Sequence, residues 1–509
     1  MNIRTILDQK AQQFGEKPAI IFQEKSITFS QMREHVLTIA NALDQLGIQK
    51  GDKVAIFLPN FPEYIFSYLA IFSIGAVAVP LDFMLTQQEV TQFLTHSDAK
   101  ILIAKSKKGI EFSALKQNCS SLEKFIIWGQ EGSSGIDGLE PSDCVTWNQV
   151  LASNADYPVQ DISDEDHSSI FYTSGSTGHP KGVLLNYGHF DNPVECIEYF
   201  LHPTSEDSYL CAGVPFSHLG GLDYMLFMLF FGSTLILMDR FHPFEALKNI
   251  QQYKPTIFCI VPAMFVAILS LKECEKFDLT SLRYPVVFGA PSAPELLKKF
   301  HRLCPNASLR NGWGMTETAA PNSYSPDDPE KINSIGPFWK GMEVKIVDDN
   351  GQELGEGARG ELWVRGKAVM VGYYKEAALT KEVTTDDGWF RTGDIVERDA
   401  QGLYYIVGRK KDMIKVGGEI VFASEVEAVL YRNPDIQEAA VLGVGDDLRG
   451  EVPKAFVVLK EGSQIAEQEI KSFLKQQLAS FKIPQQYEFR NELPKNRTGK
   501  IDKEILKKA

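Results

Sequence analysis

Residues 172–183 read Tyr-Thr-Ser-Gly-Ser-Thr-Gly-His-Pro-Lys-Gly-Val. The segment follows a strand-like run at 169–172 and joins hydroxyl side chains, glycines and a lysine. Glycines let a backbone bend until its N–H groups converge on an anion, and hydroxyls and a lysine add donors. The pattern is not a Walker loop, because the order G-x-x-x-x-G-K-[ST] is absent. The segment predicts a phosphate-binding loop, and by itself it leaves a flexible surface loop open.

Four further segments add turn and charge patterns downstream. They read Gly-Trp-Gly-Met-Thr-Glu-Thr at 312–318, Trp-Phe-Arg-Thr-Gly-Asp at 389–394, Gly-Arg-Lys-Lys-Asp-Met-Ile-Lys-Val-Gly-Gly-Glu at 408–419 and Pro-Lys-Asn-Arg-Thr-Gly-Lys-Ile at 494–501. In this order and spacing, the five segments resemble the core motifs of the adenylate-forming superfamily. That superfamily includes acyl-CoA synthetases, luciferases and peptide-synthetase adenylation domains. Each motif alone is a weak signal, but five in register are a strong one. The resemblance covers nearly the whole chain.

Apolar runs of strand length recur between helical patterns before residue 300. They lie at 54–58, 101–104, 234–237, 256–261 and 285–288. Such runs are typical of parallel strands that helices cover on both faces. From about residue 342 apolar and polar residues alternate, which indicates half-exposed β-structure in a small barrel or a distorted sheet. The expected fold class is α/β.

The chain of 509 residues is too long for one core, so we expect at least two domains. Turn and charge signals coincide at residue 408, and a compact α+β pattern follows. The resemblance implies a large N-terminal domain at 1–408, made of two parallel-sheet α/β subdomains plus a small β-barrel-like subdomain. A small, mobile α+β C-terminal domain would occupy 409–509.

Composition and charge exclude several classes of function. The net charge is −14, whereas a nucleic-acid partner needs a basic face, so no nucleic acid is expected. The seven cysteines form no C-x-x-C pair, which argues against a zinc site or a disulfide scaffold. The chain starts without the apolar segment of a secretory signal, and its longest apolar run, 225–231, is far too short to span a bilayer. We expect a cytoplasmic protein without a membrane span, as a monomer or homodimer.

The resemblance assigns one set of residues to the phosphates of ATP. The β- and γ-phosphates would contact Thr173, Ser174, Gly175, Ser176, Thr177, Gly178 and Lys181. Preorganised N–H groups and a lysine can stabilise the charge that develops on departing pyrophosphate. Thr316 matches the hydroxyl that contacts the α-phosphate, and Glu317 matches the magnesium ligand. One carboxylate suffices, because phosphates and waters complete the shell of Mg²⁺.

A second set would bind the nucleoside. Trp313 stands where many relatives carry tyrosine, and its ring can still stack on adenine. Asp394 matches the carboxylate that binds ribose hydroxyls, and Arg409 matches a second ribose or phosphate contact. The other positions of the nucleotide and acyl pockets are Gly289, Ala290, Pro291, Gly312, Gly314 and Met315.

The C-terminal motifs carry the catalytic lysine and the thiol path. Lys500 matches the lysine that bridges the substrate carboxylate and the ATP phosphate and stabilises the pentavalent transition state. No general base is needed, because a carboxylate is already ionised at neutral pH. The resemblance implies rotation about a hinge at Lys411, which lets a thiol reach the acyl-adenylate. Lys415 matches an adenylate contact, and Gly417 and Gly418 would let a pantetheine arm approach the backbone.

The acid side of the pocket is mostly apolar. Its candidate residues are Phe216, Leu222, Met225, Phe258, Val261, Pro262, Phe288 and Gly289. His218 matches a position at the pocket mouth, with a hydrogen-bonded core histidine as the alternative. Asp223 lies near the position where peptide-synthetase domains hold an α-amino group, and it stays open as a polar exception.

The predicted activity uses ATP, Mg²⁺ and coenzyme A as a co-substrate. A medium- or long-chain fatty acid would become an acyl-AMP with release of pyrophosphate, and the acyl group would then pass to the thiol of coenzyme A. An aryl acid is the alternative substrate, and a carrier-protein thiol loaded with an acyl or aminoacyl group is the alternative acceptor. A non-catalytic adenylate sensor is disfavoured, because Lys500, Glu317 and the loop at 173–181 are intact.

Overall fold

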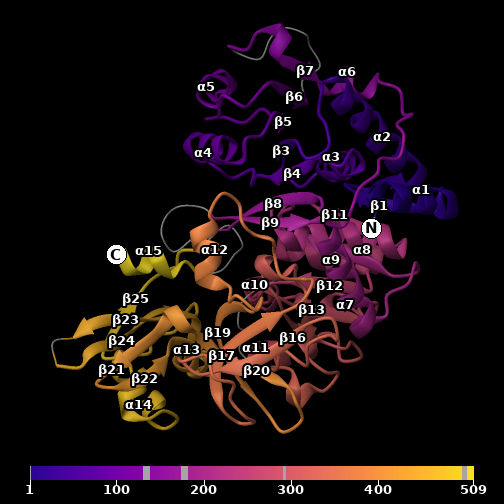
Figure 1. Cartoon of the computed structure of the whole chain (residues 1–509). Helices are drawn as coiled ribbons and strands as arrows, with labels where there is room; N and C mark the ends of the chain where they lie inside the picture. The colour runs from indigo at the N-terminus through magenta and orange to yellow at the C-terminus, as the bar shows by residue number, and fades with distance from the viewer. Residues whose placement is uncertain are drawn as a thin grey trace.

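The computed structural model describes residues 2–129, 138–173, 181–289, 294–446, 448–495 and 501–508. Within these residues the strands form four sheets (Figure 1). Two large sheets carry the first three hundred residues, a smaller antiparallel sheet follows, and the C-terminal sheet lies at one end of the molecule (Figure 1). The α/β class expected from the sequence is confirmed.

The first sheet has the order β18-β9-β8-β4-β3-β5-β6-β7. Its strands are β3 (Lys53–Phe57), β4 (Val77–Pro80), β5 (Ile101–Lys105), β6 (Lys124–Trp128), β7 (Cys144–Thr146), β8 (His167–Thr173), β9 (Lys181–Asn186) and β18 (Gly372–Tyr373). Neighbours from β8 to β7 are parallel, whereas β9 pairs antiparallel with both β8 and β18. Thr173, the last residue of β8, therefore lies at the carboxyl end of the parallel strands, where α/β sheets bind ligands.

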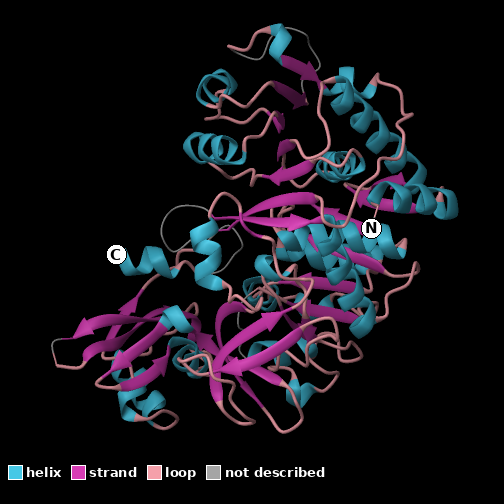
Figure 2. Ribbon diagram, viewed as in Figure 1, coloured by secondary structure: helices cyan, strands magenta, loops and turns pink. Residues whose placement is uncertain are grey.

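Helices cover both faces of this sheet (Figure 2). They are α2 (Phe29–Gln45), α3 (Pro62–Ser73), α4 (Gln87–Ser97), α5 (Phe112–Asn118) and α6 (Trp147–Leu151). In β3, Val54 and Ile56 join the core that includes α2 and α3, while Ala55 and Phe57 join the core under α4 and α5. Burial on both faces is the reason for the unbroken apolar runs in the sequence.

The second sheet has the order β15-β14-β13-β12-β10-β11-β1-β2. Its strands are β1 (Pro18–Phe22), β2 (Lys25–Thr28), β10 (Ser208–Ala212), β11 (Thr234–Met238), β12 (Ile257–Ile260), β13 (Tyr284–Val287), β14 (Arg310–Trp313) and β15 (Ser323–Tyr324). All neighbours are parallel except the edge pairs β1–β2 and β14–β15. The expected apolar runs at 234–237, 256–261 and 285–288 coincide with β11, β12 and β13.

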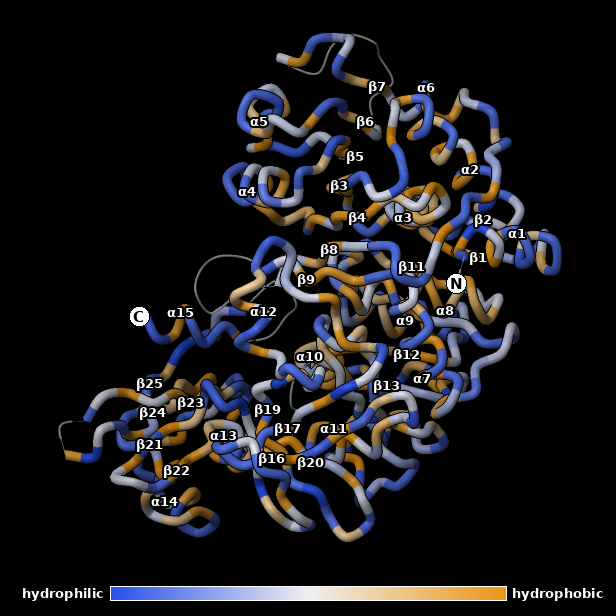
Figure 3. Tube along the Cα trace, viewed as in Figure 1, coloured by the Kyte–Doolittle hydropathy of each residue, from blue (hydrophilic) through white to orange (hydrophobic). Residues whose placement is uncertain are grey.

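This sheet is also buried on both faces, and hydrophobic segments line its strands (Figure 3). The helices around it are α1 (Ile3–Phe14), α7 (Asp191–Leu201), α8 (Leu219–Phe231), α9 (Pro243–Tyr253), α10 (Pro262–Leu269) and α11 (Pro294–His301). In β10, Tyr209 and Cys211 pack in the core that contains α8, and Leu210 and Ala212 pack in the core with α9 to α11.

The third sheet is antiparallel, with the order β16-β17-β19-β20. Its strands are β16 (Glu343–Val347), β17 (Arg359–Arg365), β19 (Phe390–Arg398) and β20 (Tyr404–Arg409), and α12 (Ala377–Val383) precedes β19. Of the two expected forms, barrel or distorted sheet, the described strands make a sheet, with register shifts between Glu361 and Trp363 and between Ile395 and Val396. The alternating sequence pattern correctly indicated β-structure here, but only β16 is half-exposed, because residues 360–364 of β17 are all buried.

The C-terminal unit has its own core. It comprises β21 (Met413–Val416), β22 (Glu419–Phe422), α13 (Ala423–Leu430), β23 (Ile436–Asp446), β24 (Gly450–Leu459), α14 (Glu467–Lys475), β25 (Gln486–Phe489) and α15 (Lys503–Lys508). One core cluster is built only from residues 414–483. Strand β20 ends at Arg409 and β21 begins at Met413, so the chain changes sheet just after the expected boundary at 408.

Short 3-10 helices join several of these elements. They are η1 (Pro141–Asp143), η2 (Tyr187–Phe190), η3 (Cys274–Lys276), η4 (Thr316–Thr318), η5 (Pro329–Lys331), η6 (Lys410–Asp412) and η7 (Ser480–Lys482). Across the described ranges, no helix is both long enough and apolar enough to cross a membrane.

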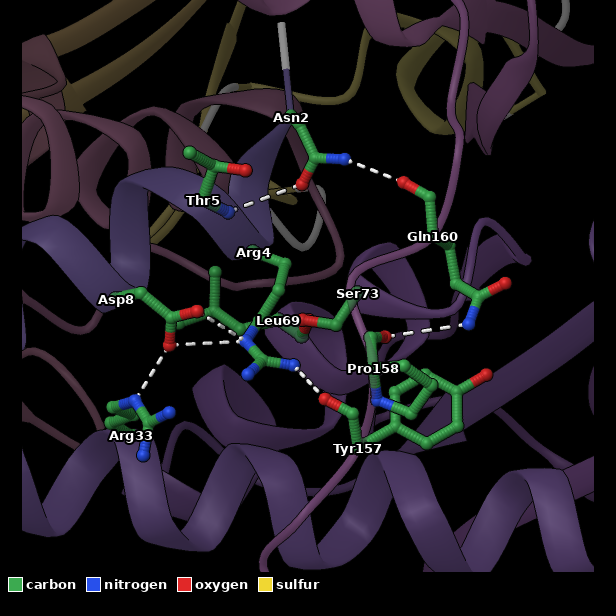
Figure 4. A network of polar contacts seen from close by, with 10 residues as sticks. All are labelled: Asn2, Arg4, Thr5, Asp8, Arg33, Leu69, Ser73, Tyr157, Pro158 and Gln160. Carbon is green, nitrogen blue, oxygen red and sulfur yellow. Dashed lines mark hydrogen bonds and ion pairs between the residues drawn. The ribbon is translucent and has the colours of Figure 1, made fainter.

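A polar network ties α1 to the rest of the N-terminal unit (Figure 4). Arg4 is buried and pairs with Asp8 at 3.0 Å, and Arg33 of α2 reaches the same carboxylate at 2.6 Å. Arg4 also donates to the carbonyl oxygen of Tyr157, in the segment before β8. A buried cation needs such partners, so this network holds α1 to α2 and to the segment before β8.

Candidate active site

The hairpin β8–β9 positions the two ends of the predicted phosphate loop. Thr173 and Lys181 face each other as the last register pair of the hairpin. Both side chains are partly exposed. The five loop positions predicted between them lie outside the described residues: Ser174, Gly175, Ser176, Thr177 and Gly178.

Lys181 and Glu317 meet around Tyr373, a residue that the sequence reasoning missed. The Tyr373 hydroxyl donates to Oε1 of Glu317 at 3.0 Å, and Nζ of Lys181 lies 5.2 Å from the centre of the Tyr373 ring. Burial, followed by the charge of Glu317, raises the pKa of Tyr373 far above its ordinary value, so the hydroxyl keeps its proton. The cation faces the ring and the carboxylate accepts from its hydroxyl, which links the start of β9 to η4.

Glu317 is buried, with 9 % of its surface exposed, and it belongs to η4 together with Thr316. Its main chain is held as well, because the Met370 amide donates to the Glu317 carbonyl oxygen at 2.9 Å. Tyr373 itself is fixed by the pairing of β18 with β9, in which it faces Val183. The segment 370–373 therefore holds both the carboxylate of Glu317, through Tyr373, and its main chain, through Met370.

On the nucleoside side, three predicted residues converge. The indole Nε1 of Trp313 donates to Oδ2 of Asp394 at 2.8 Å, and Nε of Arg409 lies 2.6 Å from Oδ1. Asp394 and Arg409 are register partners on β19 and β20, whereas Trp313 comes from β14 of the second sheet. The side chain of Asp394 is 3 % exposed, so both oxygens are held within the protein.

Trp313 is also enclosed on its ring side. It is 6 % exposed and meets Phe338 edge-on, with ring centres 5.3 Å apart and planes at 73°. The indole is thus oriented before any nucleotide binds, with its N–H directed at the predicted ribose carboxylate.

Close packing explains the glycines around Trp313. A Cβ at Gly312 would lie 2.1 Å from the Phe288 ring, and one at Gly314 would lie 2.4 Å from the Cβ of Ala320. Gly289 has φ +91°, in the left-handed region that favours glycine. The next two predicted positions, Ala290 and Pro291, lie outside the described residues. Met315 precedes η4, and its amide donates to the Thr318 hydroxyl at 3.1 Å.

His218 lies between the two large sheets. It is the N-cap residue of α8, and its Nε2 is 3.9 Å from Oδ2 of Asp82, which follows β4. The side chain is 35 % exposed.

The C-terminal positions lie on a separate sheet. Gly417 and Gly418 form the two-residue turn between β21 and β22, with φ +59° and +95°. Positive φ at both positions is what a type I′ hairpin turn requires. Lys415 is exposed, and its amide donates to Glu451 at 2.8 Å. Among the described residues, no hydrogen bond or ion pair links these three positions to the nucleotide side, and Lys500 lies outside those residues.

Comparison with known proteins agrees with this geometry. The family model described as "AMP-binding enzyme" matches residues 7–374, and that of the "AMP-binding enzyme C-terminal domain" matches residues 425–500. The chain belongs to the AMP-binding enzyme family, and it has the architecture of adenylate-forming acyl-CoA synthetases.

Relatives over the full length are acid–CoA ligases. The chain is 32 % identical to a long-chain-fatty-acid–CoA ligase of Bacillus subtilis, over 98 % of this chain and 93 % of that protein. It is also 32 % identical to 4-coumarate–CoA ligase CCL1 of Humulus lupulus, over 97 % of this chain and 91 % of the relative.

Solved structures show the same likeness. The anthranilate CoA ligase AuaEII in complex with anthranoyl-AMP superimposes with a TM-score of 0.91 at 27 % identity, covering 100 % of this chain and 97 % of that one. ATP-bound MatB from Rhodopseudomonas palustris superimposes with a TM-score of 0.88 at 26 % identity, covering 100 % of this chain and 99 % of that one. This protein is an ATP-dependent, adenylate-forming ligase of the acyl-CoA synthetase class.

Proposed function

We propose that the protein activates a medium- or long-chain fatty acid with ATP and transfers the acyl group to the thiol of coenzyme A. The observation that carries the proposal is the segment 313–317. Its first residue, Trp313, contacts the Asp394–Arg409 pair, and its last, Glu317, contacts Tyr373 beside Lys181. One short segment thus joins a nucleoside-side cluster to a phosphate-side cluster, as the binding of one ATP molecule requires.

In the first step, a carboxylate oxygen of the acid attacks the α-phosphorus. A new P–O bond forms, the bond to the β-phosphate bridging oxygen breaks, and pyrophosphate leaves. Lys181, Thr173 and the loop between them would stabilise the departing charge, while Thr316 contacts the α-phosphate. Lys500 would bridge the attacking carboxylate and the phosphate.

Magnesium fits the phosphate-side residues. Glu317 offers a buried carboxylate whose Oε1 is already oriented by Tyr373. Among the described residues, no group of three or more His, Cys, Asp or Glu side chains could enclose a metal ion. A single carboxylate with phosphate oxygens and waters is the usual way to hold Mg²⁺ beside a nucleotide. When bound, the ion would neutralise phosphate charge.

The nucleoside roles follow from the second cluster. Asp394 would accept hydrogen bonds from ribose hydroxyls, and Arg409, whose Nε lies 2.6 Å from Oδ1, orients that carboxylate. Trp313 would border adenine, in a pocket shaped by the close packing at Gly312 and Gly314.

For the second step, we propose that residues 1–408 and 409–509 act as two domains that rotate about Lys411. The separate C-terminal core and the change of sheet within 410–412 support this division. The sulfur of coenzyme A would then attack the acyl carbon, forming a C–S bond as the C–O bond to AMP breaks. Lys415 and the turn at 417–418 would border that approach.

An aryl acid is the second candidate substrate. Full-length relatives include 4-coumarate–CoA ligases, and the structure matched with a TM-score of 0.91 is an anthranilate CoA ligase. The partly exposed Phe288, whose ring meets Tyr324 edge-on at 5.4 Å, could pack on either an alkyl chain or an aromatic ring.

The deciding experiment is pyrophosphate release with ATP, Mg²⁺ and a panel of acids, followed by detection of the thioester. We expect release with alkanoates of medium and long chain, and a thioester with free coenzyme A. Faster release with benzoate-type acids would favour the aryl alternative. If the acyl group passes only to a phosphopantetheinylated carrier protein, that protein replaces coenzyme A as the acceptor.

We also propose a cytoplasmic location, which is consistent with seven unpaired cysteines, all of them among the described residues.

A further inference from the structure

The strand that carries Asp394 is bulged where it pairs with β17. The register of β17 and β19 shifts between Glu361 and Trp363, so residues 392–394 lie opposite the single residue Leu362. A bulge bends a strand and re-aims a side chain, but it leaves backbone N–H groups without partners in the ladder. The direction of the Asp394 carboxylate therefore depends on what holds this bulge.

Side chains hold the bulge in place of the ladder. The Thr392 hydroxyl accepts from the Asp394 amide at 3.0 Å and donates to the carbonyl oxygen of Leu362 at 2.7 Å. The Gly393 amide donates to Oε1 of Glu361 at 3.2 Å. Gly393 has φ +71°, in the left-handed region that favours glycine. Glu361 thus helps to fix the turn from which Asp394 projects.

The other oxygen of the same carboxylate contacts the segment after β20. Nζ of Lys410 donates to Oε2 of Glu361 at 3.0 Å, and the Glu361 side chain is only 10 % exposed. Asp349 lies 3.4 Å from the same Nζ, but its side chain is 90 % exposed. Exposed ion pairs contribute little, whereas a shielded, charge-assisted hydrogen bond is stronger. Glu361 is therefore the main partner of Lys410.

The two contacts of Glu361 close a ring. Gly393 is followed by Asp394, Asp394 pairs with Arg409 at 2.6 Å, and Arg409 is followed by Lys410. The ring runs from Glu361 through these four residues and back to its other oxygen. One buried acid thus holds both the turn of the predicted ribose carboxylate and the first residue of η6.

The ring ends one residue before the proposed hinge. Lys411 is exposed, whereas Lys410 is tied to β17. A hinge is formed by the few residues that are free to change their backbone angles. The tie at Lys410 confines rotation to Lys411 and the residues after it. Without the tie, rotation would extend back toward Arg409 and the nucleoside side of the site.

We propose that Glu361 is a positioning residue with two tasks: it fixes the bulge that aims Asp394 at the ribose, and it anchors Lys410 so that rotation begins at Lys411. This inference rests on the proposed function, in which Asp394 binds ribose and Lys411 is the hinge. It adds that the two share one carboxylate. A nucleotide that orders Asp394 then also orders the chain at Lys410.

The test separates the two tasks by substitution. Glu361→Gln keeps an acceptor oxygen for the Gly393 amide and removes the charge that binds Lys410, whereas Glu361→Ala removes both contacts. Lys410→Met removes the anchor alone. Asp349→Asn changes the exposed partner of the same lysine and is the matched control. Calorimetry gives the Kd of AMP, and hydrogen exchange with mass spectrometry follows the amides of residues 408–414 with and without AMP.

We expect the Kd of AMP to rise about tenfold or more in Glu361→Ala, because the Gly393 amide loses its acceptor. It should stay within about threefold in Glu361→Gln and Lys410→Met. Exchange over 408–414 should be about threefold faster or more in these two variants, and no faster still when they are combined, because both remove the same contact. AMP should slow this exchange in the wild type and in Asp349→Asn but not in the two variants.

Unchanged exchange over 408–414 in Glu361→Gln and Lys410→Met would overturn the anchoring task. Equal Kd values for AMP in Glu361→Ala and Glu361→Gln would overturn the task at the bulge. If Glu361→Ala does not fold, Glu361→Asp takes its place, because the shorter side chain cannot span both contacts. Failure of the proposed function looks different: no acid would release pyrophosphate, while exchange without nucleotide would still decide whether Glu361 anchors Lys410.

Discussion

The indole N–H of Trp313 donates to the carboxylate of Asp394 at 2.8 Å, across 81 residues of sequence. The sequence motifs predicted separate roles for the two residues, one at adenine and one at ribose. In the folded chain they form one unit with Arg409, which reaches the other carboxylate oxygen at 2.6 Å. The nucleoside side of the site therefore depends on the docking of the second sheet against the third.

Trp313→Phe keeps an aromatic ring but removes the donor to Asp394. Hydrogen bonds to charged groups contribute about 1.5–3 kcal/mol, so we expect KM for ATP to rise roughly tenfold or more, with a smaller change in KM for the acid. Steady-state kinetics with varied ATP measure the effect. Trp363→Phe is the matched control, because Nε1 of Trp363 has no hydrogen-bond partner among the described residues. Equal effects of the two substitutions would contradict this role.

Tyr373→Phe removes the hydroxyl that orients Glu317 and keeps the ring beside Lys181. We expect the Mg²⁺ concentration for half-maximal activity to rise several-fold, since a neutral donor to a buried carboxylate contributes on the order of 1 kcal/mol or more. The acid KM should stay constant. In Tyr374→Phe, the neighbouring hydroxyl that bonds Asp98 at 3.3 Å is lost instead, and the Mg²⁺ dependence should not move. An unchanged Mg²⁺ profile in Tyr373→Phe would exclude the orienting role.

Lys500→Ala should separate the two half-reactions. Loss of a transition-state contact of this kind costs about 10²–10³ in rate, so acyl-adenylate formation should fall at least that far. Thioester formation from supplied acyl-adenylate should stay largely intact. Lys495→Ala is the control, because it removes a lysine of the same segment that pairs with Glu438 at 2.5 Å. Equal damage to both half-reactions would argue against a lysine that serves only the first.

Asp223 should make stability depend on pH. Burial raises its pKa in the folded state, so the native protein holds a proton that the unfolded chain releases above about pH 4. The free energy of unfolding then falls with rising pH, by about 1.4 kcal/mol per unit, until the folded pKa is reached. Asp223→Asn removes this contribution, so the difference between variant and wild type should grow with pH. Urea unfolding of both proteins between pH 4 and 7 measures the free energy of unfolding. A difference between variant and wild type that stays the same at every pH would contradict the expectation.

Local sequence patterns were sufficient for much of the fold. The apolar runs at 101–104 and 234–237 correctly predicted parallel strands, because a strand buried on both faces must be apolar at every position. The alternation after residue 342 correctly predicted β-structure, which the strands form as an antiparallel sheet, but its expected half-exposure is wrong for β17, where residues 360–364 are all buried. The five motifs in register were enough for the family, since each keeps its own spacing whatever surrounds it.

Contacts between distant segments were decided only by the tertiary structure. Tyr373 belongs to no quoted motif, yet its hydroxyl reaches Glu317 across 56 residues, because β18 pairs with β9 at the edge of the first sheet. The sequence likewise marked Asp223 only as a polar exception, and packing of α8 against its neighbours leaves Oδ1 without a donor among the described residues. Short windows encode which face of an element is apolar; the side chains that meet across two elements depend on how sheets and helices dock, and no single window carries that information.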